Sequence, residues 1–499
     1  MVKHVNFRVI AYTLAGVIAF LVGMLLSPVN QFAAGFVILF SAIGLYFFIV
    51  LGVADRNWMD IRAVFSGVWM ATIGLAVFRL AEYQEVWKTK TWLLMIAAFV
   101  AFQIGSSMGI QCGLKLDRVI SPRVRALRLG KIRFQMHENR LFGICVVTTL
   151  IGFACFSINV AIKGFIPCFS DDVYAYQNFY TKFHVFAVAS TGVSGLCLYC
   201  IKTQRLAVWK KIVLLLCIFY LAFAFPIMIV SRGVFVVAAL SLATTAFYLY
   251  RRRLIALVLS LVIILGVYLG VSNLRNYTDD QLNIFFEPAK IITVVQNPEK
   301  ETDPKDKETD NPENETSNPE KETLNPDNKF EEPEQNVVSF QLPPKVAFLY
   351  GYLTVSHDNL NEAVKNIQSH SMGVRQMKPF NVILRVDRIN ELNAQAENYH
   401  VNPYLNTTNL IGDFFYDFGI IGVAVFMLLW SFVFGINQGV YDHSNGIFAL
   451  LALGNTMTPV ALCFFATWMS EFNFWLFWGV QLLLMFAACI TVQHKEEHR

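Results

Sequence analysis

Long runs of apolar residues alternate with short polar segments along most of this chain. An α-helix needs roughly 20 apolar residues to cross a bilayer, with a lower limit near 17. Runs of this length predict about twelve spanning helices, at about residues 9–27, 32–52, 63–80, 92–112, 141–162, 184–201, 212–230, 233–250, 254–272, 410–435, 447–467 and 473–492. The first run is long and others follow it, so we interpret it as a span and not as a cleaved signal peptide. The pattern predicts an all-α polytopic membrane protein.

The composition agrees with a lipid environment. Of 499 residues, 55% are hydrophobic and only 15% are charged, whereas soluble domains carry about 25% charged residues. The net charge of +4 is too small to indicate nucleic-acid binding. Most of the nine cysteines fall inside apolar runs, so we expect them to be small core residues, and their spacing does not suggest zinc.

Lysine and arginine set the expected orientation, because short cytoplasmic segments carry an excess of them. With the N-terminus inside, 21 of the 40 lie in inner segments, 6 in short outer segments and 13 in one long loop. The bias predicts a multi-pass protein with both termini cytoplasmic and the long loop outside. Helices one to nine then occupy residues 1–271, the loop residues 272–409 and the last three helices residues 410–499.

The long loop has two unlike parts. Residues 297–335 form an imperfect repeat around NPEKET, with 14 acidic and 5 basic residues and almost no apolar ones. Such a stretch cannot bury enough surface to order itself, so we expect it to be disordered. We interpret it as an insertion tolerated at a loop tip, and the alternative is an arm that binds a partner.

The second part of the loop, residues 337–395, contains aromatic and apolar residues at helical spacing. The spacing predicts several amphipathic helices packed on the outer membrane face, with apolar positions at Leu360, Val364, Ile367, Val382, Ile383, Val386 and Ile389. A structured loop of this length on a membrane protein is usually functional.

Two groups of basic residues could bind an anion. Ser231-Arg232-Gly233 separates two apolar runs by so few residues that the helices must form a tight hairpin at the outer face. Its guanidinium either clamps a phosphate or reaches lipid headgroups. The second group, in the structured part of the loop, comprises Arg375, Lys378, Arg385 and Arg388, opposed only by Asp387. It suits a lipid-linked phosphate or is an ordinary solvated face.

Two further segments carry polar residues beside apolar runs. The first, Tyr352 to Leu360, contains His357 and Asp358, and a histidine can act as a general base or fill a structural role. The second, Asn406 to Gly422, leads into a span. Its Asp413 and Asp417 are four residues apart and share a helix face. Gly419 and Gly422 predict close contact with another helix.

Several classes of function are disfavoured. A Walker motif is missing, which argues against an ATP-driven pump. The outer loops hold no DxD motif that would bind a divalent metal with a nucleotide sugar, since Asp171-Asp172 and Asp279-Asp280 are adjacent pairs. We therefore expect no metal and no cofactor.

The layout resembles the O-antigen and capsule repeat-unit polymerases of the Wzy type. The resemblance rests on many spans, an Arg-Gly at an outer hairpin, a large outer loop, and an Asn-x-Thr … Tyr-x-Asp-Phe-Gly-x-x-Gly segment at the next span. Its motifs cover about residues 231–233, 350–360 and 404–422. The acidic repeat at 297–335 departs from the family pattern.

The resemblance implies a metal-independent glycosyltransferase. Such an enzyme moves a growing glycan from undecaprenyl diphosphate to a new lipid-linked repeat unit at the outer face of the inner membrane. The implied partners are the undecaprenyl-diphosphate-linked oligosaccharide, membrane lipid and a chain-length regulator, and no nucleic acid.

The resemblance also implies roles for individual residues. Arg232 matches the hairpin arginine and would contact the leaving diphosphate, where placed cations stabilise developing negative charge. His357 or Asp358 would activate the acceptor hydroxyl. The remaining substrate-site candidates are Arg275, Arg375, Arg385, Arg388, Tyr352 and Asp417; for Asp417 we favour a role in holding the start of the helix.

Three alternatives stay open. An O-antigen ligase shares the architecture and the lipid donor but attaches the glycan to a lipid A core. A glycan flippase or other transporter is disfavoured by the large structured loop and by the lack of charges within the spans. The third is a structural or sensory membrane protein that uses the repeat as a binding arm.

Overall fold

The chain was analysed as a computed structural model. It describes residues 2–126, 128–129, 132–134, 137–170, 175–250, 290–293, 336–339, 342–384, 399–401 and 407–492. Helices dominate this part, as the apolar pattern predicts. The strands found in it are two to four residues long. The expected span at 254–272 and the acidic repeat at 297–335 lie outside the described residues.

The other eleven expected spans coincide with apolar helices. Eight segments are long and apolar enough to cross a membrane, and three apolar helices, in α3, α11 and α18, are shorter. The elements are α1 (Val2–Leu26), α2 (Gln31–Gly52), α3 (Ile61–Val77), α4 (Thr89–Ala126), α5 (Glu138–Lys163), α7 (Lys182–Ser190) with η2 (Thr191–Val193) and α8 (Ser194–Thr203), α9 (Val208–Phe219) with the π-helical turn η3 (Tyr220–Ala224) and α10 (Phe225–Met228), α11 (Arg232–Leu249), α17 (Gly412–Ser444), α18 (Ile447–Ala461) and α19 (Phe472–Cys489).

Helices α4 and α17 are in backbone contact over several turns. A Cβ atom placed on Gly109 of α4 would lie 2.1 Å from the carbonyl oxygen of Phe432, and one placed on Gly439 of α17 would lie 2.2 Å from that of Ile110. Gly105 and Gly113, one turn to either side of Gly109, meet α17 in the same way. Small residues four apart let membrane helices approach closely, and this packing fixes the centre of the bundle.

A buried ion pair ties α3 to α17 at one end of the bundle. Asp60 caps α3 by accepting from the Arg62 amide, and its carboxylate accepts from the Arg62 guanidinium at 2.7 and 2.9 Å. Gln438 of α17 donates to Asp60 at 2.8 Å and accepts from the Ile61 amide at 3.0 Å. The charges are paired and hydrogen-bonded, as burial requires.

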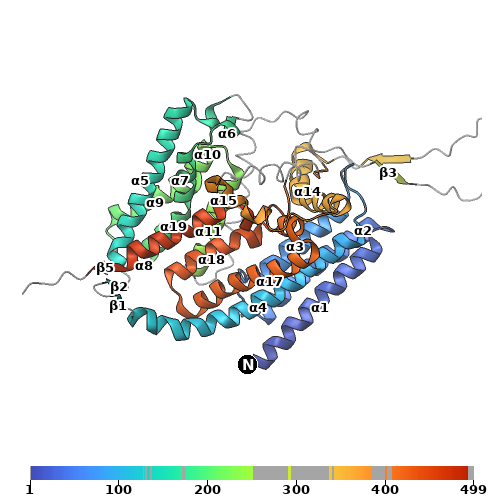
Figure 1. Cartoon of the computed structure of the whole chain (residues 1–499), viewed down its shortest axis with the longest axis horizontal. Coiled ribbons are helices and arrows are strands. Elements are labelled where there is room, and N and C mark those ends of the chain that lie inside the picture. The colour runs from blue at the N-terminus through green and yellow to red at the C-terminus, as the bar shows by residue number, and fades with distance from the viewer. Residues whose placement is uncertain are drawn as a thin grey trace, which may run out of the picture.

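Short strands lie at both ends of the bundle. β1 (Arg128–Leu129), β2 (Ile132–Phe134) and β5 (Ile490–Val492) form one antiparallel sheet, at the lower left of Figure 1. β3 (Lys290–Thr293) and β4 (Asn336–Ser339) form a second, in which Thr293 pairs with Asn336. Thr293 and Asn336, which flank the segment that contains the repeat, are therefore held side by side.

The long loop contributes α14 (Pro344–Asn366), η4 (Arg375–Met377) and α15 (Lys378–Leu384), which lie with α6 (Ala175–Asn178) and α10 at the top of Figure 1. Helices are present within residues 342–384, while the expected positions at 385–395 lie outside the described residues. Against expectation, α14 does not lie on the surface as a half-exposed helix. From Thr354 to Asn361 each of its residues is buried, because it packs against α3 and α4 and bonds to Val401, Thr407 and Asn409.

Candidate functional site

Five buried polar residues of α14, here called the α14 clasp, each bond to a different segment of the chain. They are Ser356, His357, Asp358, Asn359 and Asn361. Ser356 donates to the Phe464 carbonyl, which follows α18. Asn359 binds the backbone at 401 and 407, and Asn361 accepts from the Lys88 amide and the Thr91 hydroxyl. The α14 clasp thus fixes the position of α14 over the ends of the spans.

His357 and Asp358 lie at the centre of this network. The Asp358 carboxylate accepts from Gln84 Nε2 and Trp87 Nε1, both at 2.8 Å, and burial raises the pKa of Asp358 to about 7. The two ring nitrogens of His357 lie 3.0 Å from Thr72 Oγ1 and 3.2 Å from Asn409 Nδ2. Burial lowers the pKa of His357 to about 3, so its imidazole is neutral.

This arrangement bears on the predicted role of both residues as activators of an acceptor hydroxyl. His357 is 0% and Asp358 2% exposed, and the two lie against α3 and the connection between α3 and α4. A general base must come within hydrogen-bonding reach of the proton that it takes. Their geometry favours holding α14 in place.

A second network, here called the Arg375 knot, joins η4 to the start of α17. It consists of Arg375, Asp413 and Asp417. Arg375 donates from Nε and Nη2 to Asp413 Oδ1 at 2.9 and 2.7 Å, and its guanidinium lies 5.0 Å from the centre of the Tyr416 ring. Burial lowers the pKa of Arg375, but attraction from Asp413 outweighs this and raises it. The cation is held by a carboxylate inside the protein.

Asp417 caps the short helical segment that begins at Arg375. Its carboxylate accepts from the amides of Arg375 and Gln376 at 2.9 Å and from the Ser371 hydroxyl. An acidic side chain at a helix start satisfies amides that have no partner in the helix. The prediction that Asp417 holds a helix start agrees with this, although the segment concerned is η4 and not α17 itself.

The predicted role of Gly419 and Gly422 as sites of helix–helix contact is wrong. Gly419 has φ 64° and ψ −152°, which break α17 at this point, and the ring of His370 lies where a side chain would stand. Space at Gly422 is taken up by Phe418 and Phe414 of its own segment. Gly419 permits the kink, because a positive φ is costly for residues with a Cβ atom.

The Arg375 knot also positions the turn between α18 and α19. The Asp413 amide donates to Thr467 Oγ1 at 3.1 Å, Gln376 donates to Ser470 at 3.2 Å, and Lys378 pairs with Glu471 at 2.6 Å. This turn contains η5 (Trp468–Ser470). These contacts with α17, η4 and α15 fix the turn that carries the indole of Trp468.

Tyr352, a predicted substrate-site residue, belongs to a row of aromatic rings that ends at Trp468. Tyr352 is stacked with Phe465 at 6.2 Å between ring centres, and Phe465 with Trp468 at 6.3 Å. All three side chains are half-buried. The row connects α14 with the turn before α19.

The hairpin that holds Arg232 has a strained backbone. Val230 adopts φ 51°, a conformation that is a genuine outlier for a β-branched residue. Ser231 then caps α11 by accepting from the Val234 amide at 3.4 Å, and Arg232 is the first residue of that helix. Strain of this kind persists where surrounding structure enforces it and gathers at functional sites. The side chain of Arg232 lies outside the described part.

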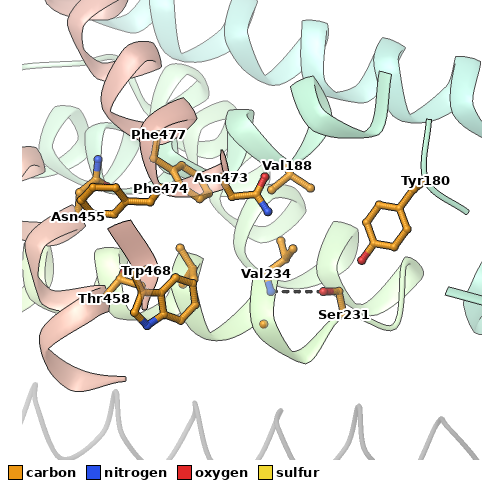
Figure 2. A pocket seen from close by; sticks show the side chains of 12 residues that line it. Tyr180, Val188, Ser231, Val234, Asn455, Thr458, Trp468, Asn473, Phe474 and Phe477 are labelled. Atoms are coloured by element: carbon orange, nitrogen blue, oxygen red, sulfur yellow. Dashed lines mark hydrogen bonds between the residues drawn. The ribbon is translucent and has the colours of Figure 1, made fainter. Parts of the chain in front are cut away.

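A pocket opens directly beside this hairpin. It is lined by Tyr180, Val188, Ser231, Gly233, Val234, Val237, Asn455, Thr458, Trp468, Asn473, Phe474 and Phe477. The space among them is about 680 Å³, the open mouth included. Figure 2 shows Asn455, Phe474 and Phe477 on one side of it and Tyr180 and Ser231 on the other.

The pocket has an exposed rim and a buried floor. Gly233, Asn473 and Tyr180 are exposed, whereas Asn455 and Thr458 are only 7% and 5% exposed. Asn455 Nδ2 has no hydrogen-bond partner in the described part of the chain. A buried amide without a partner is unfavourable unless a water or a ligand meets it.

The structure thus brings together some predicted residues and separates others. The Arg232 hairpin borders the pocket, Tyr352 joins the aromatic row that reaches it, and Arg375 and Asp417 support its wall. His357 and Asp358 lie in the α14 clasp. Arg275, Arg385 and Arg388 are outside the described residues.

Sequence reasoning did not identify Asn455, Thr458, Trp468 or Asn473. A usable signal was the pair Asn455 and Thr458 inside the expected span at 447–467, since polar side chains within a span are costly and often functional. No group of histidine, cysteine or acidic side chains suited to a metal ion occurs among the described residues. Comparison of the chain with protein-family models, with curated proteins and with solved structures gives no match.

Proposed function

We propose that the chain is a polymerase of lipid-linked oligosaccharide repeat units of the O-antigen or capsule type. It would transfer the growing glycan from undecaprenyl diphosphate to a new lipid-linked unit at the outer face of the bacterial inner membrane. The eight helices that could cross a membrane suit a lipid-linked substrate. The resemblance in layout described above supplies the reaction class.

One observation carries the proposal beyond the resemblance. The pocket begins at the hairpin of Arg232, the residue expected to contact the diphosphate, and it lies between spans α11, α18 and α19. A lipid-linked glycan needs a site that is open to the membrane surface and reaches polar groups between helices. The neutral amide, hydroxyl and indole groups of this pocket offer hydrogen bonds and a flat apolar face, as a sugar requires.

In this proposal the protein residues have separate tasks. Arg232 and the amides at the start of α11 would stabilise the charge that develops on the leaving diphosphate, since a helix start attracts anions. The Arg375 knot holds the wall that bears Trp468. The α14 clasp, with His357 and Asp358, keeps α14 in place and does not touch the reacting atoms.

The test is a glycan gel from a strain in which the gene is deleted. Loss of the ladder, leaving a band with one repeat unit, would support the polymerase. Full-length polymer left on the lipid carrier would indicate a ligase, and repeat units trapped on the inner leaflet a flippase. An unchanged ladder would refute any role in glycan assembly.

Complementation tests the site itself. Arg232→Ala should fail to restore the ladder. The matched control is Arg205→Ala, because Arg205 is an exposed arginine in the short connection between α8 and α9 and does not border the pocket. Both proteins should be present in the membrane in equal amounts. Restoration of a full ladder by Arg232→Ala would remove the diphosphate contact from the proposal.

A further inference from the structure

The floor of the pocket combines buried polar groups with uncharged walls. The described side chains that line it carry no charge. One of its buried polar residues, Asn455, is 7% exposed and leaves Nδ2 without a partner in the described part of the chain. A diphosphate would enter such a space without a counter-charge, which is costly away from water.

The polar character continues below the floor. Ser241 lies one turn beyond Val237 on α11, and Gln481 one turn beyond Phe477 on α19, so both extend helix faces that line the pocket. Ser241 Oγ and Gln481 Nε2 are buried and, within the described residues, also lack partners. A Cβ atom on Gly454, next to Asn455, would lie 3.1 Å from Ser241 Oγ. Hydroxyl and amide groups without partners in the described residues therefore lie on α11, α18 and α19, and α18 packs against both of the others.

Trp468 and Phe474 add apolar surface to this polar floor. An aromatic face packs against the C–H side of a pyranose ring, while neutral amides and hydroxyls match its hydroxyl groups. Water alone would satisfy the amides but would not use the apolar walls. The combination selects a ligand that is polar at its edges, apolar on one face and uncharged.

We infer that the pocket binds the first, uncharged sugar of the lipid-linked substrate, with Asn455 as the residue that recognises it, while the diphosphate stays at the rim beside the start of α11. The inference rests on the proposed function and deepens it. Among the described residues, apart from its own chain neighbours, Gly233 at the rim has no atom within 4 Å of the position of a Cβ, which leaves room for the diphosphate there.

The experiment measures binding to the purified full-length protein in lipid nanodiscs. The probes are undecaprenyl diphosphate without sugar and the same lipid bearing either one N-acetylglucosamine or one galactose. We expect the wild-type protein to bind at least one of the sugar-bearing lipids about tenfold more tightly than the bare lipid. Asn455→Leu should abolish this preference and leave the affinity for the bare lipid unchanged.

Two further variants make the result specific. Asn437→Leu is the matched control, because Asn437 is an amide on α17 that donates to Thr456 at 3.1 Å and does not line the pocket. It should keep the preference. Thr458→Val removes one floor hydroxyl at nearly constant shape and should weaken the preference in part, so the test does not depend on correct folding of Asn455→Leu.

The outcomes separate the inference from the proposed function. Equal affinity of the wild-type protein for all three lipids, or a preference that survives both floor substitutions, would overturn the sugar site while the glycan gel could still support the polymerase. If the wild-type protein binds none of the lipids, the proposed function fails and the inference with it. Loss of the preference in Asn455→Leu and its weakening in Thr458→Val, with no change in Asn437→Leu, would establish the sugar site.

Discussion

The ion pair between Arg375 and Asp413 offers a decisive test of how the site is built. The two side chains are 10% and 4% exposed and meet at 2.7 Å. If Arg375 serves the structure, its charge matters only while Asp413 is present. If it binds a substrate phosphate, its loss should be harmful whether Asp413 is present or not.

The expected magnitudes follow from burial. Arg375→Met leaves the Asp413 carboxylate without its partner, and Asp413→Asn leaves a buried guanidinium facing a neutral amide. Breaking a buried pair from one side costs about 3–5 kcal/mol, whereas replacing both charges is often nearly neutral. The double variant should therefore be more stable than either single one, which requires a coupling energy larger than the cost of either single substitution, above about 3 kcal/mol.

The assay is a double-mutant cycle with two readouts. Reversible unfolding in mixed micelles gives the free energy of unfolding, and the glycan ladder gives activity in cells. Stability and ladder should both decline in the single variants and recover together in the double one. Asp417 still caps η4 in every variant, because it accepts from backbone amides. Additive losses of stability, or a double variant that is stable yet inactive, would refute the structural role of Arg375.

Three other perturbations test separate parts of the molecule. Gly109→Ala should destabilise the fold by about 1–3 kcal/mol, because a Cβ would stand 2.1 Å from a backbone oxygen of α17. Gly143→Ala on α5, where no described atom lies within 4 Å of the Cβ position, should be neutral or slightly stabilising. Equal effects of the two substitutions in thermal unfolding would contradict the close contact. Replacing residues 294–335 by Asn-Gly should leave a stable protein that still restores the ladder, since Thr293 and Asn336 are paired and a two-residue turn can join them; loss of the ladder in a stable protein would instead assign the repeat a role in binding. Stability should fall by about 2–3 kcal/mol between pH 5 and pH 7, because burial raises the pKa of Asp358 to about 7 and the unfolded carboxyl, with a pKa near 3.8, ionises first. Hydrogen exchange in α14 measures this change in stability, and Asp358→Asn should remove its dependence on pH. Greater stability at pH 7 than at pH 5 would mean that Gln84 and Trp87 hold the carboxylate ionised.

The sequence alone determined the membrane helices and the position of the hairpin. Spanning helices can be read from sequence because a long apolar run dictates both the helix and its solvent, whatever its neighbours are. Eleven of the expected spans coincide with apolar helices for this reason. The glycines of α4 were also readable, since Gly105, Gly109 and Gly113 recur every four residues, although that pattern was not used.

Only the tertiary structure decided what the polar residues do. The side chains of His357 and Arg375 have the same chemistry whether they contact a substrate or another side chain of the same protein. The choice depends on Thr72, Asn409 and Asp413, which lie 38 to 285 residues away from their partners along the chain and meet them only after the helices pack. The same packing gathers Asn455 and Trp468 beside the hairpin. The periodicity of apolar residues predicts which face of a helix is buried, but long-range packing determines which residues that face contacts.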